Sequence, residues 1–503
     1  EKNPDQLTHQ PPNIILILVD DMGFSDLGCY GSEIRTPNID QLAEEGLRFT
    51  QFHNTSKCFP SRACLLTGLY AQQTGNDRRH DSLRNSVTLG EVLRHAGYRT
   101  LASGKHHGKE NLYFRGFDHY YGLRDGASNH FNPGMQREGE PEPAQKVRFG
   151  KRKWCIDSVT VSPYTPPEDF YTTDYFTDHA IKYLEEYQDE DQPFFLYLAY
   201  TAPHDPLQAW PEDIEKYKGW YDDGYKQIRQ HRYQKQLDIG LVNTDQFPIT
   251  EPSYKPWDSL TANQQAIEAR KMEVYAAMID RLDQNVGRLL AKLEETGKRE
   301  ETIIFFCSDN GASAEVVGAG SLNEGAKEGA PDKIGTIGYW ASLGPDWANV
   351  SNTPYRLFKN YTHEGGICTP LIVHWPGQVQ AGTFTDYTGH FIDFMPTFVE
   401  LAGAEYPDNF AGTAIPQMKG ESFVNVLKGE KTKRTKPIFW EWAKGKGVWQ
   451  DGYKLVSDNE KAWELYHLPS NKTETINLID SLPDRAKMMD QMWIQWREEM
   501  DHF

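Results

Sequence analysis

The sequence has no apolar segment long enough to cross a membrane. Its longest apolar run near the start covers residues 14–19, whereas a transmembrane helix needs about 20 apolar residues in succession. The sequence also opens without a positively charged segment followed by an apolar one. We therefore expect that any signal peptide has been removed or was never present, and that the chain has no membrane span.

Cysteine is also scarce, and basic residues are outnumbered by acidic ones. The six cysteines are scattered over 503 residues, which indicates no disulfide framework, and no two have the Cys-x-x-Cys spacing of zinc sites. The formal net charge of −19 argues against a nucleic-acid partner. Hydrophobic residues nevertheless make up 38% of the chain and charged residues 25%. This composition is typical of a globular protein, and the length suggests two domains, or one large domain with an appendage.

Short apolar runs alternate with segments of helical periodicity along most of the chain. The runs cover residues 14–19, 194–200, 302–307 and 371–375, and the helical segments cover residues 37–46, 88–96, 174–187 and 263–296. Runs that are apolar on both faces are typical of buried strands in a parallel sheet. The alternation predicts an α/β fold, with a large mixed, mostly parallel sheet flanked by helices on both faces.

The pattern changes from about Lys436. Short strand-like runs follow at residues 438–442, 448–450, 453–456 and 463–467, with a hairpin signal at Asp451 and Gly452 between two of them, and residues 483–500 have helical periodicity. We predict an α/β domain over residues 1–430 and a small C-terminal α+β subdomain over residues 431–503, with an antiparallel sheet and one helix. Residues 210–257, rich in Tyr, Asp and Lys, are predicted to form a surface insertion.

Oxygen-bearing side chains follow two of the predicted strands. Asp20 and Asp21 come after the run at 14–19, and Asp309 and Asn310 come after the run at 302–307. Sites in open α/β sheets form beyond the carboxyl ends of the strands. Either pair alone is more simply a helix cap or a turn. Both pairs together favour a site for a hard cation, Ca²⁺ or Mg²⁺.

A lysine and histidines follow two further apolar runs. Lys105, His106 and His107 come after residues 99–103, and His204 comes soon after residues 194–200. A single histidine in a loop is more often structural than catalytic. Together, these residue types suit the binding of an anion and proton transfer near neutral pH.

Cys58 begins a segment that is predicted to form a helix. Pro60 suits the first turn, and apolar residues continue behind it. Cys58 then lies at the helix N-terminus, where negative charge is favoured, and Arg62 lies one turn further on. From these residues alone, Cys58 is either an activated thiolate nucleophile or a buried cysteine.

These motifs, in this order, resemble the type I, formylglycine-dependent sulfatases, an arylsulfatase-like family of the alkaline phosphatase superfamily. The signature around Cys58, Pro60, Ser61 and Arg62 continues into residues 65–68. The other matching motifs lie at residues 12–23, 104–108, 202–204, 308–311, 363–366, 464–466 and 477–478. The resemblance covers nearly the whole chain. It departs from the family at His106, where tryptophan is common.

The resemblance implies a role for each matching residue. Asp20, Asp21, Asp309, Asn310 and the modified Cys58 would bind Ca²⁺, with Mg²⁺ as the alternative. Lys105, His204 and Lys359 would hold the sulfate, Arg62 would stabilise residue 58, His204 would protonate the leaving oxygen, and His107 would act as the base. A formylglycine-generating enzyme would oxidise Cys58. One hydroxyl of the hydrated aldehyde would attack sulfur, and loss of a proton from the other would expel sulfate.

The predicted function is hydrolysis of an O-sulfated carbohydrate, an oligo- or polysaccharide, in the periplasm or outside the cell. The alternatives are an arylsulfatase acting on small aryl sulfates, a phosphate or phosphonate monoester hydrolase on the same fold, and a non-catalytic binder of sulfated glycans. The aromatic residues of segment 210–257 would offer stacking surfaces for sugar rings. A basic run is either a solvated loop or a guide for an anionic polysaccharide, and it consists of Lys146, Arg148, Lys151, Arg152 and Lys153.

Overall fold

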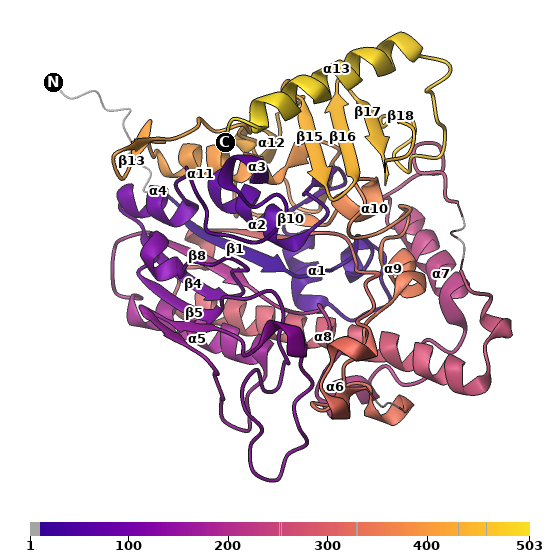
Figure 1. Ribbon diagram of the computed structural model, residues 1–503. Coiled ribbons are helices and arrows are strands. Elements are labelled where there is room, and N and C mark those ends of the chain that lie inside the picture. The colour runs from indigo at the N-terminus through magenta and orange to yellow at the C-terminus, as the bar shows by residue number, and fades with distance from the viewer. Residues whose placement is uncertain (1–10, 251, 253, 328–329, 431, 459) are drawn as a thin grey trace.

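A ten-stranded sheet forms the centre of the fold in the computed structural model, which describes residues 11–250, 252, 254–327, 330–430, 432–458 and 460–503 (Figure 1). Its strands, in spatial order, are β11 (Thr383–Thr385), β2 (Leu47–Phe49), β10 (Leu371–His374), β9 (Thr302–Ser308), β1 (Asn13–Val19), β8 (Phe194–Ala199), β4 (Arg99–Gly104), β5 (His119–Leu123), β6 (Trp154–Ile156) and β7 (Val159–Val161). The neighbours from β9 to β5 are all parallel. The predicted mixed, mostly parallel sheet is confirmed.

Helices cover both faces of this sheet. β1 shows why, because all seven of its residues are buried. Ile15, Ile17 and Val19 face one core, with α1 (Pro37–Glu44), α5 (Thr172–Glu186) and α8 (Ala262–Glu295). The alternate residues of β1 face a second core, with α2 (Cys58–Thr67), α4 (Leu89–His95) and α11 (Phe394–Ala402). No helix in the described part of the chain combines the length and the apolar character needed to span a membrane.

One apolar run has a direction that the sequence did not predict. The apolar pattern predicts that residues 371–375 form one of the parallel strands. The corresponding strand, β10, instead pairs antiparallel with both β9 and β2. Helices bury both faces of β10 just as they bury those of β1, so the two strands have the same apolar pattern. The pattern reports burial and carries no information about strand direction.

A smaller antiparallel sheet lies near the C-terminus, as predicted (Figure 1). Its strands are β15 (Ile438–Trp442), β16 (Gly445–Gln450), β17 (Tyr453–Ser457) and β18 (Glu464–His467). One face packs against α13 (Pro483–Met500), and the other packs against Ile367 of α10 (Glu364–Ile367). The predicted domain boundary lies beside residue 431, which is outside the described residues, as are residues 1–10 of the first domain. The division into two domains stays a prediction.

Segment 210–257 lies at the surface through many of its described residues, as predicted, but it also packs side chains into the core, which the prediction of a surface insertion did not include. Positions 251 and 253 lie outside the described residues. The segment contains α6 (Pro211–Glu215) and α7 (Gly224–Asp238). Tyr217, Tyr221 and Tyr225 are at most 2% exposed, so their rings cannot stack on a sugar. Arg232 is buried and pairs with Asp26 at 2.6 Å and with Glu33 at 2.8 Å. Its partners are about 200 residues away in sequence, and this pairing is what allows the charged Arg232 side chain to be buried.

Candidate active site

The carboxyl ends of parallel strands bring the predicted metal and anion residues together. Asp20 and Asp21 follow β1, Asp309 and Asn310 follow β9, and Lys105 follows β4. Asn310 Nδ2 donates to Asp21 Oδ1 at 2.6 Å, and the backbone N–H of Asp21 donates to Asp309 Oδ1 at 3.3 Å. Lys105 Nζ donates to Asp20 Oδ2 at 2.5 Å. The two polar pairs predicted from separate strands thus form one cluster.

The charges of this cluster fit a divalent cation. Burial, together with the neighbouring Asp20, raises the pKa of Asp309 to about 6. Burial also acts to raise the pKa of Asp20, but Lys105 and His204 outweigh it and leave the pKa lowered. Among the described residues, Asp20 Oδ1 and Asn310 Oδ1 are buried without a hydrogen-bond partner. Buried carboxylates that repel one another, with unused oxygens, are a donor set suited to Ca²⁺ or Mg²⁺.

Cys58 is the first residue of α2 and is 3% exposed. The predicted helix start is therefore confirmed. Burial raises the pKa of the Cys58 thiol, even though Lys105 and Lys359 attract negative charge there. The unmodified residue is thus a neutral thiol, which argues against the activated thiolate considered from the sequence.

Arg62 joins the start of α2 to the carboxylate cluster. Its Nε and Nη2 both lie 2.8 Å from Asp309 Oδ2. Its Nη1 donates to the backbone oxygen of Lys105 at 2.8 Å. The buried guanidinium holds two strand ends and the Cys58 helix in fixed relation.

Lys359 adds a second buried ammonium to the site. It lies between α9 (Pro345–Ser351) and α10, is 1% exposed, and donates to Asp21 Oδ2 at 2.8 Å. Its backbone N–H donates to the Ala312 oxygen at 3.1 Å, just beyond the end of β9. Burial acts to lower the pKa of Lys359, but Asp21 and Glu315 outweigh it and hold that pKa well above its ordinary value. The side chain is therefore charged and positioned for an anion.

His204 faces the cluster through one ring nitrogen and is held by the other. Its Nε2 lies 3.5 Å from Asp21 Oδ2, and its Nδ1 lies 2.9 Å from Asp205 Oδ1. Ser342 Oγ donates to Asp205 at 2.6 Å and fixes that carboxylate. Burial lowers the pKa of His204, but Asp21 and Asp20 outweigh it, and the net pKa is raised. His204 is suited to carry a proton on Nε2.

His107 has the opposite electrostatic character. Its ring lies between Phe59 and His80, with centroids 5.6 and 5.3 Å away. Burial, followed by the positive charge of Lys105, lowers its pKa well below the ordinary value. Its Nδ1 is buried without a hydrogen-bond partner in the described part of the chain. A neutral imidazole of this kind can accept a proton.

A cavity of about 600 Å³ opens over these groups. The predicted site residues on its wall are Cys58, His107, His204 and Lys359. His80, Asp125 and Glu315 also line it and were not predicted from the sequence, nor was the role of Asp205 behind His204. Asp205 adjoins a motif residue and could have been found from that position. His80 lies in a loop with no recognisable pattern, so the sequence offered no signal for it.

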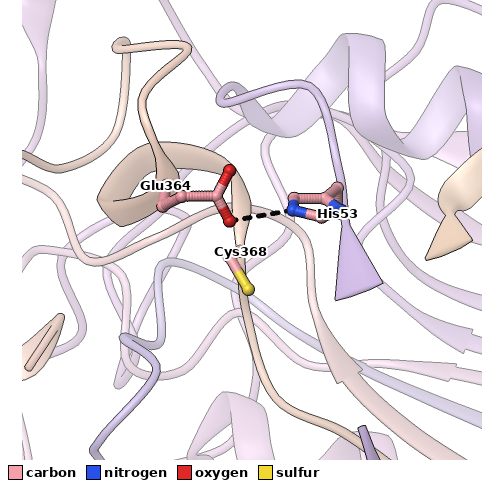
Figure 2. A group of neighbouring side chains, drawn as sticks. All are labelled: His53, Glu364 and Cys368. Atoms are coloured by element: carbon pink, nitrogen blue, oxygen red, sulfur yellow. Dashed lines mark hydrogen bonds and ion pairs between the residues drawn. The ribbon is translucent and has the colours of Figure 1, made fainter. Parts of the chain in front are cut away.

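A second buried cluster lies beneath the C-terminal sheet (Figure 2). His53 Nε2 lies 2.9 Å from Glu364 Oε2, and Cys368 lies beside them. Lys454 of β17 contacts Glu364 at 2.7 Å and Glu474 at 2.8 Å. The lysine supplies the positive charge that a metal would otherwise provide. The cluster is therefore a buried ion network that ties β17 of the small sheet to α10 and to β3 (Phe52–His53).

Known proteins resemble this chain in sequence and in fold. The Sulfatase family model matches residues 12–404, and the N-sulphoglucosamine sulphohydrolase, C-terminal, model matches residues 355–501. A sulfatase of Schizosaccharomyces pombe is 32% identical, over 98% of this chain and 95% of its own. An arylsulfatase of Klebsiella aerogenes is 35% identical, over 82% and 91%. The crystal structure of Ps i-CgsB with k-i-k-neocarrahexaose has a TM-score of 0.70 at 25% identity, over 97% of this chain and 93% of that one.

The fold is that of the alkaline phosphatase superfamily, and the chain belongs to its Sulfatase family. The protein is a sulfuric ester hydrolase. The resemblance seen in the sequence is thereby confirmed as to family and reaction class.

Proposed function

We propose that the protein removes sulfate from an O-sulfated carbohydrate, an oligo- or polysaccharide, through a formylglycine at residue 58 and a divalent cation. The observation that carries this proposal is the position of Cys58. It begins α2 on the wall of the cavity, where its thiol is influenced by Lys105, Lys359, Asp20 and Asp309. A neutral thiol is a weak nucleophile, so these surroundings suit a modified residue better.

Four oxygen-bearing residues would hold the cation: Asp20, Asp21, Asp309 and Asn310. When bound, Ca²⁺ (with Mg²⁺ as the alternative) supplies Lewis-acid stabilisation of negative charge. The unpartnered oxygens and the raised pKa of Asp309 support this assignment. The Sulfatase family generally uses a divalent cation and formylglycine, which supports it further.

Formylglycine at residue 58 would supply a hydrated aldehyde, one hydroxyl of which could attack sulfur, while the other, by losing its proton, would let the aldehyde re-form and sulfate leave. Lys105 and Lys359 bind the sulfate oxygens, because each ammonium has three donors and retains some beyond its contact with aspartate. His204 donates the proton on Nε2 to the leaving oxygen, since an alkoxide leaves poorly without one. Neutral His107 accepts the proton of the hydroxyl at residue 58.

A carbohydrate substrate is supported by relatives. The structure of Ps i-CgsB holds k-i-k-neocarrahexaose, and N-acetylgalactosamine-6-sulfatase of Sus scrofa is 28% identical over 86% of this chain. The 35% identical Klebsiella enzyme is an arylsulfatase, so small aryl sulfates are the second candidate substrates. A phosphonate monoester hydrolase shares the fold at 18% identity, and that similarity shows the fold alone.

Maturation and location follow from this function. Only 3% of Cys58 is exposed, so an enzyme that oxidises it must reach the residue before the fold closes around it. We therefore include a formylglycine-generating enzyme as a partner during synthesis. We also propose a periplasmic or secreted location, because sulfated polysaccharides occur outside the cytoplasm.

The test is to produce the protein together with a formylglycine-generating enzyme. Mass spectrometry of the peptide that contains residue 58 then measures conversion. Released sulfate is measured with defined sulfated oligosaccharides and 4-nitrophenyl sulfate, beside 4-nitrophenyl phosphate. We expect conversion and sulfate release from a sugar. A wide preference for the phosphate ester, or full activity with an unconverted thiol, would refute the proposal.

A further inference from the structure

The cavity above Cys58 has a second group of cations, separate from the residues that would hold the sulfate. Lys146, Arg148 and Arg152 line it together with Cys58 and Lys359. They belong to the segment between β5 and β6, and they are three of the five members of the basic run noted in the sequence. Lys151 and Lys153 of that run are not among the described lining residues. The fold therefore places three of the five basic side chains of the run on the cavity wall.

The backbone around Lys146 is fixed against a distant part of the chain. Lys146 forms an isolated antiparallel bridge with Leu322. Next to it, the Gln145 N–H donates to Asn323 Oδ1 at 3.0 Å, and the Ala144 N–H donates to the Ile337 oxygen at 2.9 Å. Ala144 and Leu322 also share a small buried apolar cluster. Lys146 is therefore held at a defined position, unlike a lysine in a solvated loop.

The ammonium of Lys146 lies over an aromatic ring and has no ion-pair partner in the described part of the chain. Its Nζ is 4.9 Å from the ring centre of Trp340. Among the described residues, no carboxylate lies within 4.0 Å of it. The two carboxylates that influence it most are engaged elsewhere: Asp205 with His204, and Glu315 with Lys57 at 2.5 Å.

Like charges also lie near Lys146. Burial lowers the pKa of this side chain; Asp205 and Glu315 oppose that shift, and Lys359 and Arg152 add to it. Burial likewise lowers the pKa of Arg152, against the opposing charge of Asp125. Partly dehydrated cations that repel one another across a cavity are relieved when an anion binds between them.

We propose that Lys146 and Arg152 bind a second anionic group of the substrate, so that the preferred sugars carry another sulfate or a carboxylate near the sulfate that is removed. This inference rests on the proposed function and narrows its substrate class. Lys105 and Lys359 hold the reacting sulfate against the carboxylate cluster. Lys146 and Arg152 recognise the second group from the cavity wall, and the planar guanidinium of Arg152 is suited to either anion.

The first experiment compares matched substrates with the formylglycine-containing enzyme. Each sulfated monosaccharide that it hydrolyses is tested beside the same sugar with a second sulfate, and beside the disaccharide in which a uronic acid adjoins it. We expect kcat/KM to be at least about tenfold higher for one of the doubly anionic compounds, the gain from one charge-assisted contact. The disulfate and uronate arms show which anion is recognised.

Two variants test whether these side chains cause the preference. Lys146→Gln should lower the ratio of kcat/KM for the doubly anionic to the singly anionic sugar about tenfold, and Arg152→Gln should lower it in the same direction. Lys151→Gln, an exposed neighbour outside the described cavity lining, is the matched control and should leave the ratio unchanged. Thermal unfolding checks that each variant is folded. If Lys146→Gln does not fold, the ratio measured with Arg152→Gln tests the proposal.

The outcomes separate this inference from the function on which it rests. If converted enzyme releases sulfate from no sugar and not from 4-nitrophenyl sulfate, the proposed function is wrong, and this inference falls with it. If singly sulfated sugars are hydrolysed as well as doubly anionic ones, the function stands and the second-anion site is wrong. If Lys146→Gln lowers kcat/KM equally for the singly and the doubly anionic sugar, the second-anion site is also wrong.

Discussion

Titration of the protein with CaCl₂ should release about one proton for each calcium bound at pH 5, and almost none at pH 7.5. The reason lies in Asp309, whose pKa is raised from 3.8 to about 6 by burial and by Asp20. Below pH 6 the cation-free protein therefore keeps a proton on this carboxyl. A carboxylate ligand must be deprotonated, so calcium has to displace that proton.

The magnitude follows from the same shift. Below about pH 6 the apparent calcium affinity should fall about tenfold, or about 1.4 kcal/mol, for each pH unit, and above it the affinity should be constant. The raised pKa also means that ionised, cation-free Asp309 destabilises the fold by about 3 kcal/mol. This penalty is absent below the unfolded pKa of 3.8 and complete above the folded pKa of about 6. Chelation with EDTA should therefore lower the unfolding temperature more at pH 7.5 than at pH 5.

Calorimetry in two buffers of different protonation enthalpy measures the released proton. Asp283→Asn is the matched control, because the pKa of Asp283 is also raised to about 6 by burial. Asp283 accepts hydrogen bonds from Asn38 and Ile39, away from the cavity. This variant should release the same number of protons as the wild type. An absence of proton release at pH 5, or undiminished release in Asp309→Asn, would refute the reasoning.

Three further substitutions test separate parts of the structure. Cys58→Ala should abolish sulfate release without unfolding the protein, since it removes the precursor of formylglycine. Lys454→Met should lower the free energy of unfolding by about 3 kcal/mol in a denaturant titration, because it leaves Glu364 and Glu474 buried without their cation. Gly126→Ala should lower kcat in sulfate release, because the added Cβ would lie 2.4 Å from His107 Nε2 and displace that ring.

Each substitution has a control elsewhere in the chain. For Cys58→Ala it is Cys64→Ala, a buried cysteine of the same helix, which should retain activity. Lys444 pairs with Glu460 on the surface, and Lys444→Met should change stability by no more than about 0.5 kcal/mol. Gly320 has open space where a Cβ would be, so Gly320→Ala should keep full activity. Loss of activity in both glycine variants would contradict the role given to the His107 ring.

Much of the main architecture could be predicted because burial leaves a direct trace in sequence. A strand covered by helices on both faces must be apolar throughout, as residues 14–19 are, and the polar residues that follow it mark the sheet edge where sites form. The terminal helix was predicted at residues 483–500 and observed as Pro483–Met500. Two features were not predicted because they depend on distant partners. The direction of β10 is set by β9 and β2, and Arg232 is buried by virtue of Asp26 and Glu33.

The sequence by itself determined the apolar strands, the family signature around Cys58 and the pairs Asp20–Asp21 and Asp309–Asn310, since each depends on neighbours in the chain. The tertiary structure alone decided which charges meet. It buries Cys58 deeply enough to keep its thiol neutral. It also places Lys146 and Arg152 on the cavity wall and leaves Lys151 exposed. Charge and solvation depend on distances through space, and the order of residues along the chain does not contain those distances.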